Sequence, residues 1–131
     1  MALDVGAQES FGFGKDPIVI RKYIAGIKGG VVLDMTDWKG GDFIRAGHVI
    51  IRSTDDETYK PMPLNSGGTA YNSLPGSHEY VGVCVATKSA KEPFVSVMHT
   101  GVVNDVASPY PLDSIKTALK AAVPTLVFEH D

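Results

Sequence analysis

The stretch PYPLDSIKTALKAAVPTLVFEHD, residues 109–131, decides the fold because it is the one segment with a clear helical pattern. Pro111 is tolerated just before a helix, and Asp113 predicts the N-cap. Apolar residues then recur at spacings of three and four, which places them on one face. This face consists of Leu112, Ile115, Ala118, Leu119 and Ala122, with Lys116 and Lys120 on the opposite side.

The same stretch predicts where the helix ends and what it packs against. Pro124 stops the helix, and the apolar run TLVFE at residues 125–129 predicts a strand. A helix of about ten residues is marginal alone in water, so its apolar face must be buried against a sheet. We therefore expect this helix to close the core of a domain built mainly from strands.

The rest of the chain carries strand patterns separated by turn residues. Six segments predict strands: 17–27, 31–36, 48–52, 58–63, 79–88 and 92–106. The third and fourth are expected to pair across the polar turn STDDE, and the last two across SAK, because their apolar residues alternate. Gly40, Gly41 and Gly47 are predicted to adopt positive φ angles, and residues 65–78 predict a long surface loop.

These patterns predict a mainly β fold with one short C-terminal helix, in the form of a small single-domain β-barrel-like or β-sandwich-like structure. A length of 131 residues fits one domain. We expect this domain to span residues 17–131. Residues 1–16 combine small, polar and glycine residues around Phe11 and Phe13, which predicts a flexible N-terminal arm.

The composition narrows the class of protein. Hydrophobic residues make up 44% and charged residues 21% of the chain, which is typical of an ordered globular domain. The net charge is −3 and the 12 Lys and Arg residues are spread thinly, so we expect no direct contact with nucleic acid. No apolar run approaches the roughly 20 residues that cross a bilayer, and the N-terminus lacks the features of a secretion signal. We expect no membrane partner.

Residues that could carry chemistry form no recognisable catalytic or metal-binding pattern. The four histidines lack metal-ligand spacing: His48, His78, His99 and His130. Cys84 lies in an alternating apolar run, which predicts a buried, reduced thiol. Asp55, Asp56 and Glu57 predict a solvated turn rather than an acid/base pair or a calcium site. We therefore expect no catalytic residue, no metal and no cofactor.

Trp38, the one tryptophan, follows a predicted strand and precedes two glycines. A tryptophan in this position either fills the core of its own domain or anchors a binding partner. Both interpretations stay open at the level of the sequence.

One alternative is a carrier domain. The segment GGDFIRAGHVI, residues 40–50, resembles the glycine-punctuated turn of biotinyl and lipoyl carrier domains, and Lys60 would then be the modified lysine. However, Lys60 precedes PMP and falls on the far arm of the predicted hairpin instead of at its tip.

Residues 46–131 resemble the head decoration proteins of tailed bacteriophages, of the lambda type. The segments that carry the resemblance are AGHVIIRSTDDETYKPMP, EYVGVCVATKSAKEPFVSVMHTGVVN and LDSIKTALKAAVPTLVFEHD. The matching residues, in order, are Gly47, Val49, Tyr59, Pro61, Val81, Gly82, Val83, Gly101, Val103, Leu119, Lys120, Ala121 and Phe128. Before residue 46 the chain has additional strand-like sequence, so a related auxiliary capsid protein or the base of a head fibre also fits.

The resemblance implies a structural virion protein without enzymatic activity. It would be made in the host cytoplasm, bind the major capsid protein on the exterior of an assembled phage capsid as a homotrimer, and stabilise that capsid. The predicted capsid contacts are Phe11, Phe13, Lys15 and Trp38. A different β-rich binding module and the carrier domain remain the alternatives.

Overall fold

The structure is a computed structural model that describes residues 16–130. Strands predominate in this part of the chain, which confirms the predicted mainly β class. The elements are α2 (Asp16–Val19), β2 (Ile20–Gly26), β3 (Val31–Val32), β4 (Phe43–Ile44), β5 (Val49–Ser53), β6 (Tyr59–Pro61), β7 (His78–Cys84), β8 (Lys88–Ser89), β9 (Phe94–Val95), β10 (Val97–Val103), α3 (Lys116–Ala122) and β11 (Leu126–Phe128).

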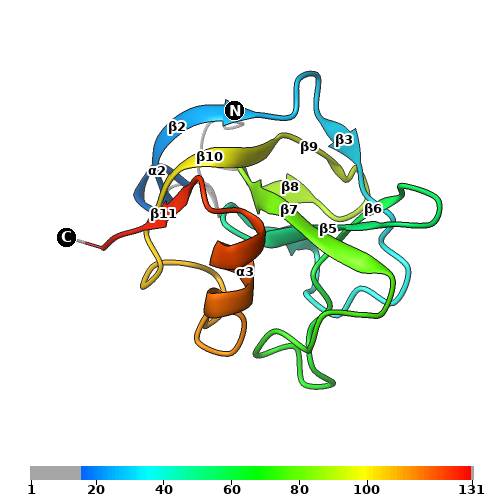
Figure 1. The fold of residues 1–131 in the computed structure, drawn as a ribbon. Coiled ribbons are helices and arrows are strands. Elements are labelled where there is room, and N and C mark those ends of the chain that lie inside the picture. Colours follow the sequence, from blue (N-terminus) through cyan, green and yellow to red (C-terminus); the bar gives the residue numbers. More distant parts are fainter. Residues whose placement is uncertain (1–15, 131) are drawn as a thin grey trace, which may run out of the picture.

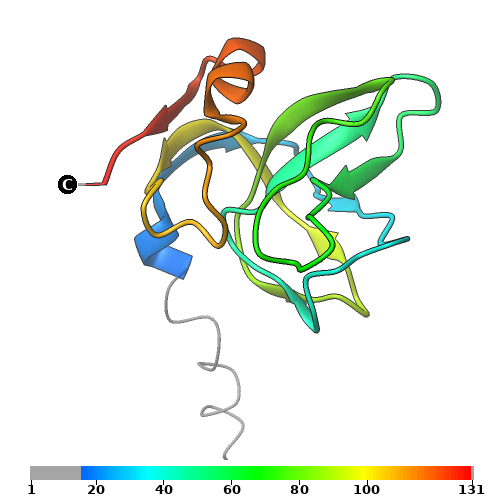
Figure 2. The same cartoon turned by 90° about the horizontal axis from the view of Figure 1, so that it is seen from below.

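The main sheet is open, with the strand order β11-β10-β7-β5-β6 and with β2 paired to the other edge of β10. Figures 1 and 2 show α3 beside β11 at one end of this sheet and the β5–β6 hairpin at the other end. The barrel-like form, which the sequence predicted beside a sandwich-like one, was therefore wrong. The two end strands do not meet, because no pairing joins β6 back to β2 or β11 within residues 16–130.

The hairpin predicted for residues 79–106 is only partly formed. β7 and β10 pair at two positions, Val97↔Cys84 and Met98↔Val83. The chain between them leaves the sheet, because β8 pairs with β4 and β9 pairs with β3 in two small separate sheets. The hairpin predicted between β5 and β6 is confirmed, with Ile51 opposite Lys60.

The C-terminal helix forms and is buried on one side, as predicted. It begins at Lys116, and its N-cap is Ile115, without a side-chain hydrogen bond, so the prediction that Asp113 caps it was wrong. Leu112, Ile115 and Leu119 of the predicted apolar face are buried, and Val123 continues the same spacing. Ala118 and Ala122, which were expected on the buried face, are exposed.

The helix also has a topological role. The predicted final strand is confirmed as β11, and it runs parallel to β10, with Gly101 opposite Leu126. Two neighbouring strands that run in the same direction cannot be joined by a tight turn and need a crossover connection, usually a helix. The chain therefore keeps α3 as the crossover between β10 and β11 (Figure 1).

Buried apolar side chains form two clusters, one on each face of β5. Successive residues of a strand point to opposite faces, so Val49 and Ile51 join the cluster under α3 while Ile50 joins the cluster against β3 and β9. Cys84 lies in the second cluster, and its thiol donates to the carbonyl oxygen of Ala86 at 3.0 Å. Burial raises the pKa of this thiol to about 12, in agreement with the predicted inert cysteine.

Several local predictions need correction. Residues 17–19 were expected in a strand but belong to α2, which is anchored where both Asp16 carboxylate oxygens accept hydrogen bonds from Thr87. Gly41 and Gly47 have the predicted positive φ angles, whereas Gly40 does not. A side chain at Gly40 would collide with the ring of Trp38, so close contact explains that glycine.

We expect Leu119→Ala to lower the free energy of unfolding by about 2 to 4 kcal/mol, because the leucine side chain is fully buried between helix and sheet. Lys120→Ala, one position along on the exposed side of α3, should change it by less than about 0.5 kcal/mol. Urea unfolding of the two variants measures both values. Equal, small losses would mean that α3 does not close the core.

Candidate functional site

The histidines do not gather into a metal site. Among residues 16–130, no three His, Cys, Asp or Glu side chains lie close enough together to hold a metal ion. His78 contacts the carbonyl oxygen of Gly76 at 2.8 Å, and His99 contacts the hydroxyl of Thr100 at 2.8 Å. Each of these imidazoles thus has a local structural contact. No helix in the described part of the chain is long and apolar enough to span a bilayer.

The acidic turn at residues 55–57 lies between β5 and β6 and is exposed. The Asp56 carboxylate accepts a hydrogen bond from the backbone N–H of Thr58 at 3.1 Å, and hydrogen bonding by Thr58 lowers the pKa of Asp56. The hydroxyl of Ser53 accepts a hydrogen bond from the backbone N–H of Asp55 at 3.2 Å. These contacts are those of a solvated turn that holds its own backbone, as the sequence predicts.

Lys60, the residue at issue in the carrier alternative, lies within β6 opposite Ile51 and not in the turn. A lysine that carries a prosthetic group must reach the active sites of other proteins, and in carrier domains the tip of a hairpin presents it. Its position inside a paired strand therefore weighs against a carrier role.

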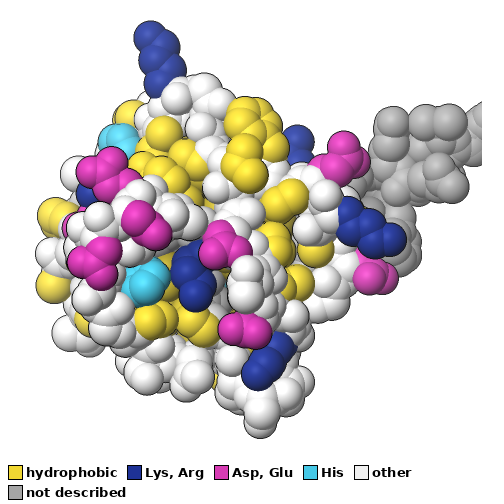
Figure 3. Space-filling view, turned by 90° about the vertical axis from the view of Figure 1, so that its right-hand side faces the viewer, with side chains coloured by type: hydrophobic (Ala, Val, Ile, Leu, Met, Phe, Trp, Pro, Cys, Tyr) yellow, Lys and Arg dark blue, Asp and Glu magenta, His cyan; other side chains and the backbone are white. Residues whose placement is uncertain are grey.

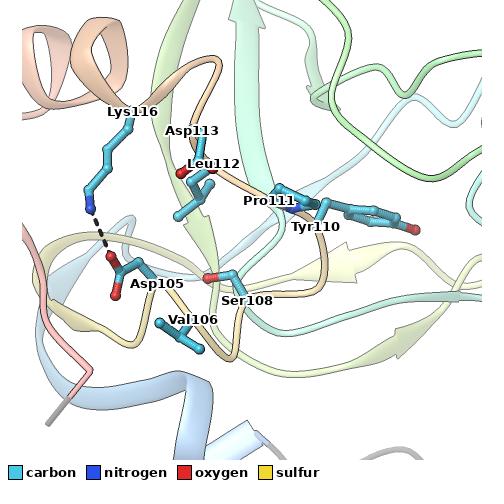
Figure 4. A pocket seen from close by; sticks show the side chains of 8 residues that line it. All are labelled: Asp105, Val106, Ser108, Tyr110, Pro111, Leu112, Asp113 and Lys116. Atoms are coloured by element: carbon cyan, nitrogen blue, oxygen red, sulfur yellow. Dashed lines mark hydrogen bonds and ion pairs between the residues drawn. The ribbon is translucent and has the colours of Figure 1, made fainter.

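A pocket of about 320 Å³ opens between the end of β10 and α3 (Figure 4). Its lining consists of Asp105, Val106, Ser108, Tyr110, Pro111, Leu112, Asp113 and Lys116. The Asp105 carboxylate pairs with Lys116 at 2.7 Å and with His130 at 3.0 Å. The hydrogen bond from Lys116 is the main cause that lowers the pKa of Asp105 to about 2. This carboxylate stays ionised at neutral pH and ties β10, α3 and the end of the chain together.

Three aromatic rings surround His48, which lies directly before β5. The ring centre of His48 lies 5.1 Å from that of Trp38, 5.2 Å from that of Tyr71 and 5.5 Å from that of Tyr110, in edge-on arrangements. Each aromatic residue comes from a different loop. We call these four residues the histidine cluster. It ties together three loops that are distant in the sequence.

The polar atoms of His48 are not equally satisfied. The imidazole is fully buried, and its Nε2 lies 3.0 Å from the carbonyl oxygen of Met62. A carbonyl only accepts, so Nε2 carries the proton and donates it, and Nδ1 carries a lone pair. Nδ1 has no hydrogen-bond partner among the described residues. Burial lowers the pKa of this histidine to about 4, so the ring is neutral at pH 7.

Tyr71 corrects the prediction that residues 65–78 form only a surface loop. Its ring is buried, and its hydroxyl accepts a hydrogen bond from the backbone N–H of Val49 at 3.1 Å. An isolated β-bridge between Leu64 and Tyr71 holds the loop at this point. The loop thus supplies a core residue, which its turn-rich composition did not indicate.

The structure places one of the four predicted capsid contacts. Trp38 is partly buried, packs against both apolar clusters and donates a hydrogen bond from Nε1 to the carbonyl oxygen of Gly41 at 2.9 Å. These contacts favour the core-filling interpretation of Trp38 over the anchoring one. Phe11, Phe13 and Lys15 lie outside the described residues.

Exposed apolar side chains occupy two places on the surface. The first, which we call the edge patch, consists of Ile18, Tyr23 and Ile24 on α2 and β2, each more than half exposed. The second is the cross-strand pair of Val32 and Phe94 on β3 and β9. Figure 3, which views the molecule from the right-hand side of Figure 1, shows hydrophobic side chains in the upper half of that face and others lower down among charged side chains. The residues of the edge patch follow one another along one edge of the sheet, and large exposed apolar side chains at such a place mark a candidate interaction site.

The backbone of β2 is less suited to binding than its side chains. β2 is an edge strand whose register against β10 shifts three times, and it carries Arg21 and Lys22. Bulges and cations on an edge strand oppose pairing with another strand. The edge patch is therefore a candidate for contact through apolar side chains.

No protein-family model matches the chain, and neither a curated protein nor a solved structure is detectably similar to it.

We expect Tyr71→Phe to lower the free energy of unfolding by about 1 to 3 kcal/mol, because it leaves the buried N–H of Val49 without an acceptor. Tyr23→Phe, which makes the same change at a tyrosine that is 51% exposed, is the matched control and should be close to neutral. Chemical denaturation of both variants measures the difference. Equal effects would show that the Tyr71 hydroxyl does not support the start of β5.

Proposed function

We propose that this chain is a structural protein of a tailed-phage particle that binds the outer surface of the assembled capsid and stabilises it. The observation that carries this role is the edge patch, in which three large apolar side chains are exposed on α2 and β2. The patch directly follows residues 1–15, the segment predicted to dock on the capsid. The resemblance of residues 46–131 to head decoration proteins gives the partner, the major capsid protein.

The displaced pKa values in the described part of the chain have structural causes and call for no catalytic role. Burial accounts for Cys84 and His48, and pairing with Lys116 accounts for Asp105. In contrast, the apolar side chains of the edge patch lie outside both buried clusters and are more than half exposed. Their burial against a partner would be favourable.

The energetics suit a small capsid-binding domain. Burying the exposed half of a side chain such as Ile24 contributes about 1 kcal/mol, so the edge patch alone provides weak binding. A homotrimer that engages several capsid subunits at once multiplies such weak contacts. If the chain binds only the assembled lattice, it stabilises that lattice by mass action. An auxiliary capsid protein or a head-fibre base would use the same surface in the same way.

We expect the double variant Tyr23→Ser, Ile24→Ser to bind purified expanded capsids of the parent phage roughly thirtyfold more weakly per subunit, since about 2 kcal/mol of apolar burial is lost. Val106→Ser is the matched control, because Val106 is 73% exposed but lies in the loop after β10. Co-sedimentation with the capsids measures binding, and an unchanged melting temperature shows that the variants are folded.

A chain that begins at Asp16 completes the experiment, because it keeps the carboxylate that anchors α2 to Thr87. It removes the predicted contacts Phe11, Phe13 and Lys15 and should also lose binding. Undiminished co-sedimentation of both the double variant and the shortened chain would exclude this surface. Failure of the unaltered chain to bind any assembled capsid would exclude the proposed role itself.

A further inference from the structure

We propose that His48 is an acid-sensitive lock on the three loops that carry Trp38, Tyr71 and Tyr110. The neutral imidazole holds these loops together, and a proton on Nδ1 releases them while the strands stay paired. This inference concerns the regulation of loop structure and does not depend on the proposed capsid role.

The position of the ring makes it suited to this task. Gly47, with φ 90°, sets the chain direction just before His48, and a side chain at Gly47 would collide with Val19. The imidazole is thereby fixed at the point where the three loops meet. Tyr71 and Tyr110 also contact each other, with ring centres 5.5 Å apart. Loss of the contacts to the central ring therefore loosens all three loops together.

We call the arrangement in which the three loops contact His48 the closed state, and the one in which they are released the open state. Protonation of the ring is unfavourable in the closed state. Nε2 already donates to the carbonyl oxygen of Met62, so an added proton must go to Nδ1, which faces no acceptor among the described residues. A buried, charged N–H group without an acceptor is costly. In water the same group is fully hydrated, so acid favours an arrangement in which the ring is exposed.

The charged groups near the cluster do not offset this cost. The phenols of Tyr71 and Tyr110 stay neutral in acid, because burial raises both pKa values. Arg45, which acts electrostatically on Tyr110, is a cation, and Cys84, which acts on Tyr71, is a neutral thiol. The pKa of His48 reflects burial and the hydrogen bond to Met62, with no charge acting on the ring among the described residues.

The direction of the pH effect follows from linkage. The pKa of the closed state is about 4, below the ordinary value of 6.5, so the open state binds the proton more tightly. Above pH 6.5 the ring is neutral in both states, so the stability of the closed state relative to the open state does not change with pH. As the pH falls from 6.5 to 4, each unit shifts the equilibrium toward the open state by up to about tenfold.

Trp38 provides a direct reporter, because it is the one tryptophan and its ring lies 5.1 Å from His48. We would measure acrylamide quenching of its fluorescence between pH 7.5 and 3.5, with far-UV circular dichroism on the same samples. In the unaltered chain, quenching should rise below about pH 5.5, at least one pH unit above any loss of the circular dichroism signal.

Two variants test whether protonation of His48 causes the change in quenching. His48→Gln keeps an N–H for the Met62 carbonyl but binds no proton, so the midpoint of the quenching transition should move down by at least one pH unit. His78→Gln, at a histidine whose Nδ1 contacts the Gly76 carbonyl, should behave like the unaltered chain. An unchanged midpoint in His48→Gln would overturn the proposal, and so would a quenching transition that coincides with loss of the strand signal.

An NMR titration of the unaltered chain keeps the proposal testable if His48→Gln does not fold. Long-range ¹H–¹⁵N spectra should show that Nδ1 of His48 stays unprotonated down to about pH 5 and takes up its proton together with the Trp38 transition. Protonation near pH 6.5 without any change at Trp38 would contradict the lock.

Discussion

The parallel pairing of β11 with β10 is the constraint on which the rest of the structure depends. This parallel pairing requires a crossover connection, and α3 is that connection. The apolar stripe of α3 is buried against the sheet. β11 occupies one edge of β10 at residues 101–103, and β7 pairs with the same edge at Val97 and Met98. The chain between β7 and β10, residues 85–96, leaves the sheet beyond the opposite end of this pairing. It builds the small sheets with β3 and β4, and the second apolar cluster lies against β3 and β9.

The buried clusters and the candidate contact surfaces lie in different parts of the molecule. The two buried clusters hold the strands, and the histidine cluster fixes three long loops on them. The edge patch lies on β2, where register shifts oppose strand pairing but leave Tyr23 and Ile24 accessible. Such a surface suits docking through side chains on a partner that presents many equivalent sites, as a capsid does.

Local patterns in the sequence predicted the elements whose formation is itself local. The β5–β6 hairpin, the final strand and the burial of Leu119 and Cys84 follow from alternation or helical spacing. The helix start was missed because no side chain caps it, and its first turn is fixed by tertiary packing of Ile115. The open sheet and the split of the β7–β10 hairpin were missed because they depend on pairing between distant segments, such as β9 with β3 and β8 with β4, which no local pattern encodes.

The histidine cluster was beyond sequence reasoning for a similar reason, since its rings come from three loops with no shared pattern. The proposed role on the capsid is most directly tested by cryo-electron microscopy of this chain mixed with expanded capsids of the phage that encodes it under this proposal. We predict added density on the outer surface at regular lattice positions, with the α2–β2 edge toward the capsid. Capsids without added density at saturating protein, or density bound through the opposite end of the sheet at β6, would contradict it.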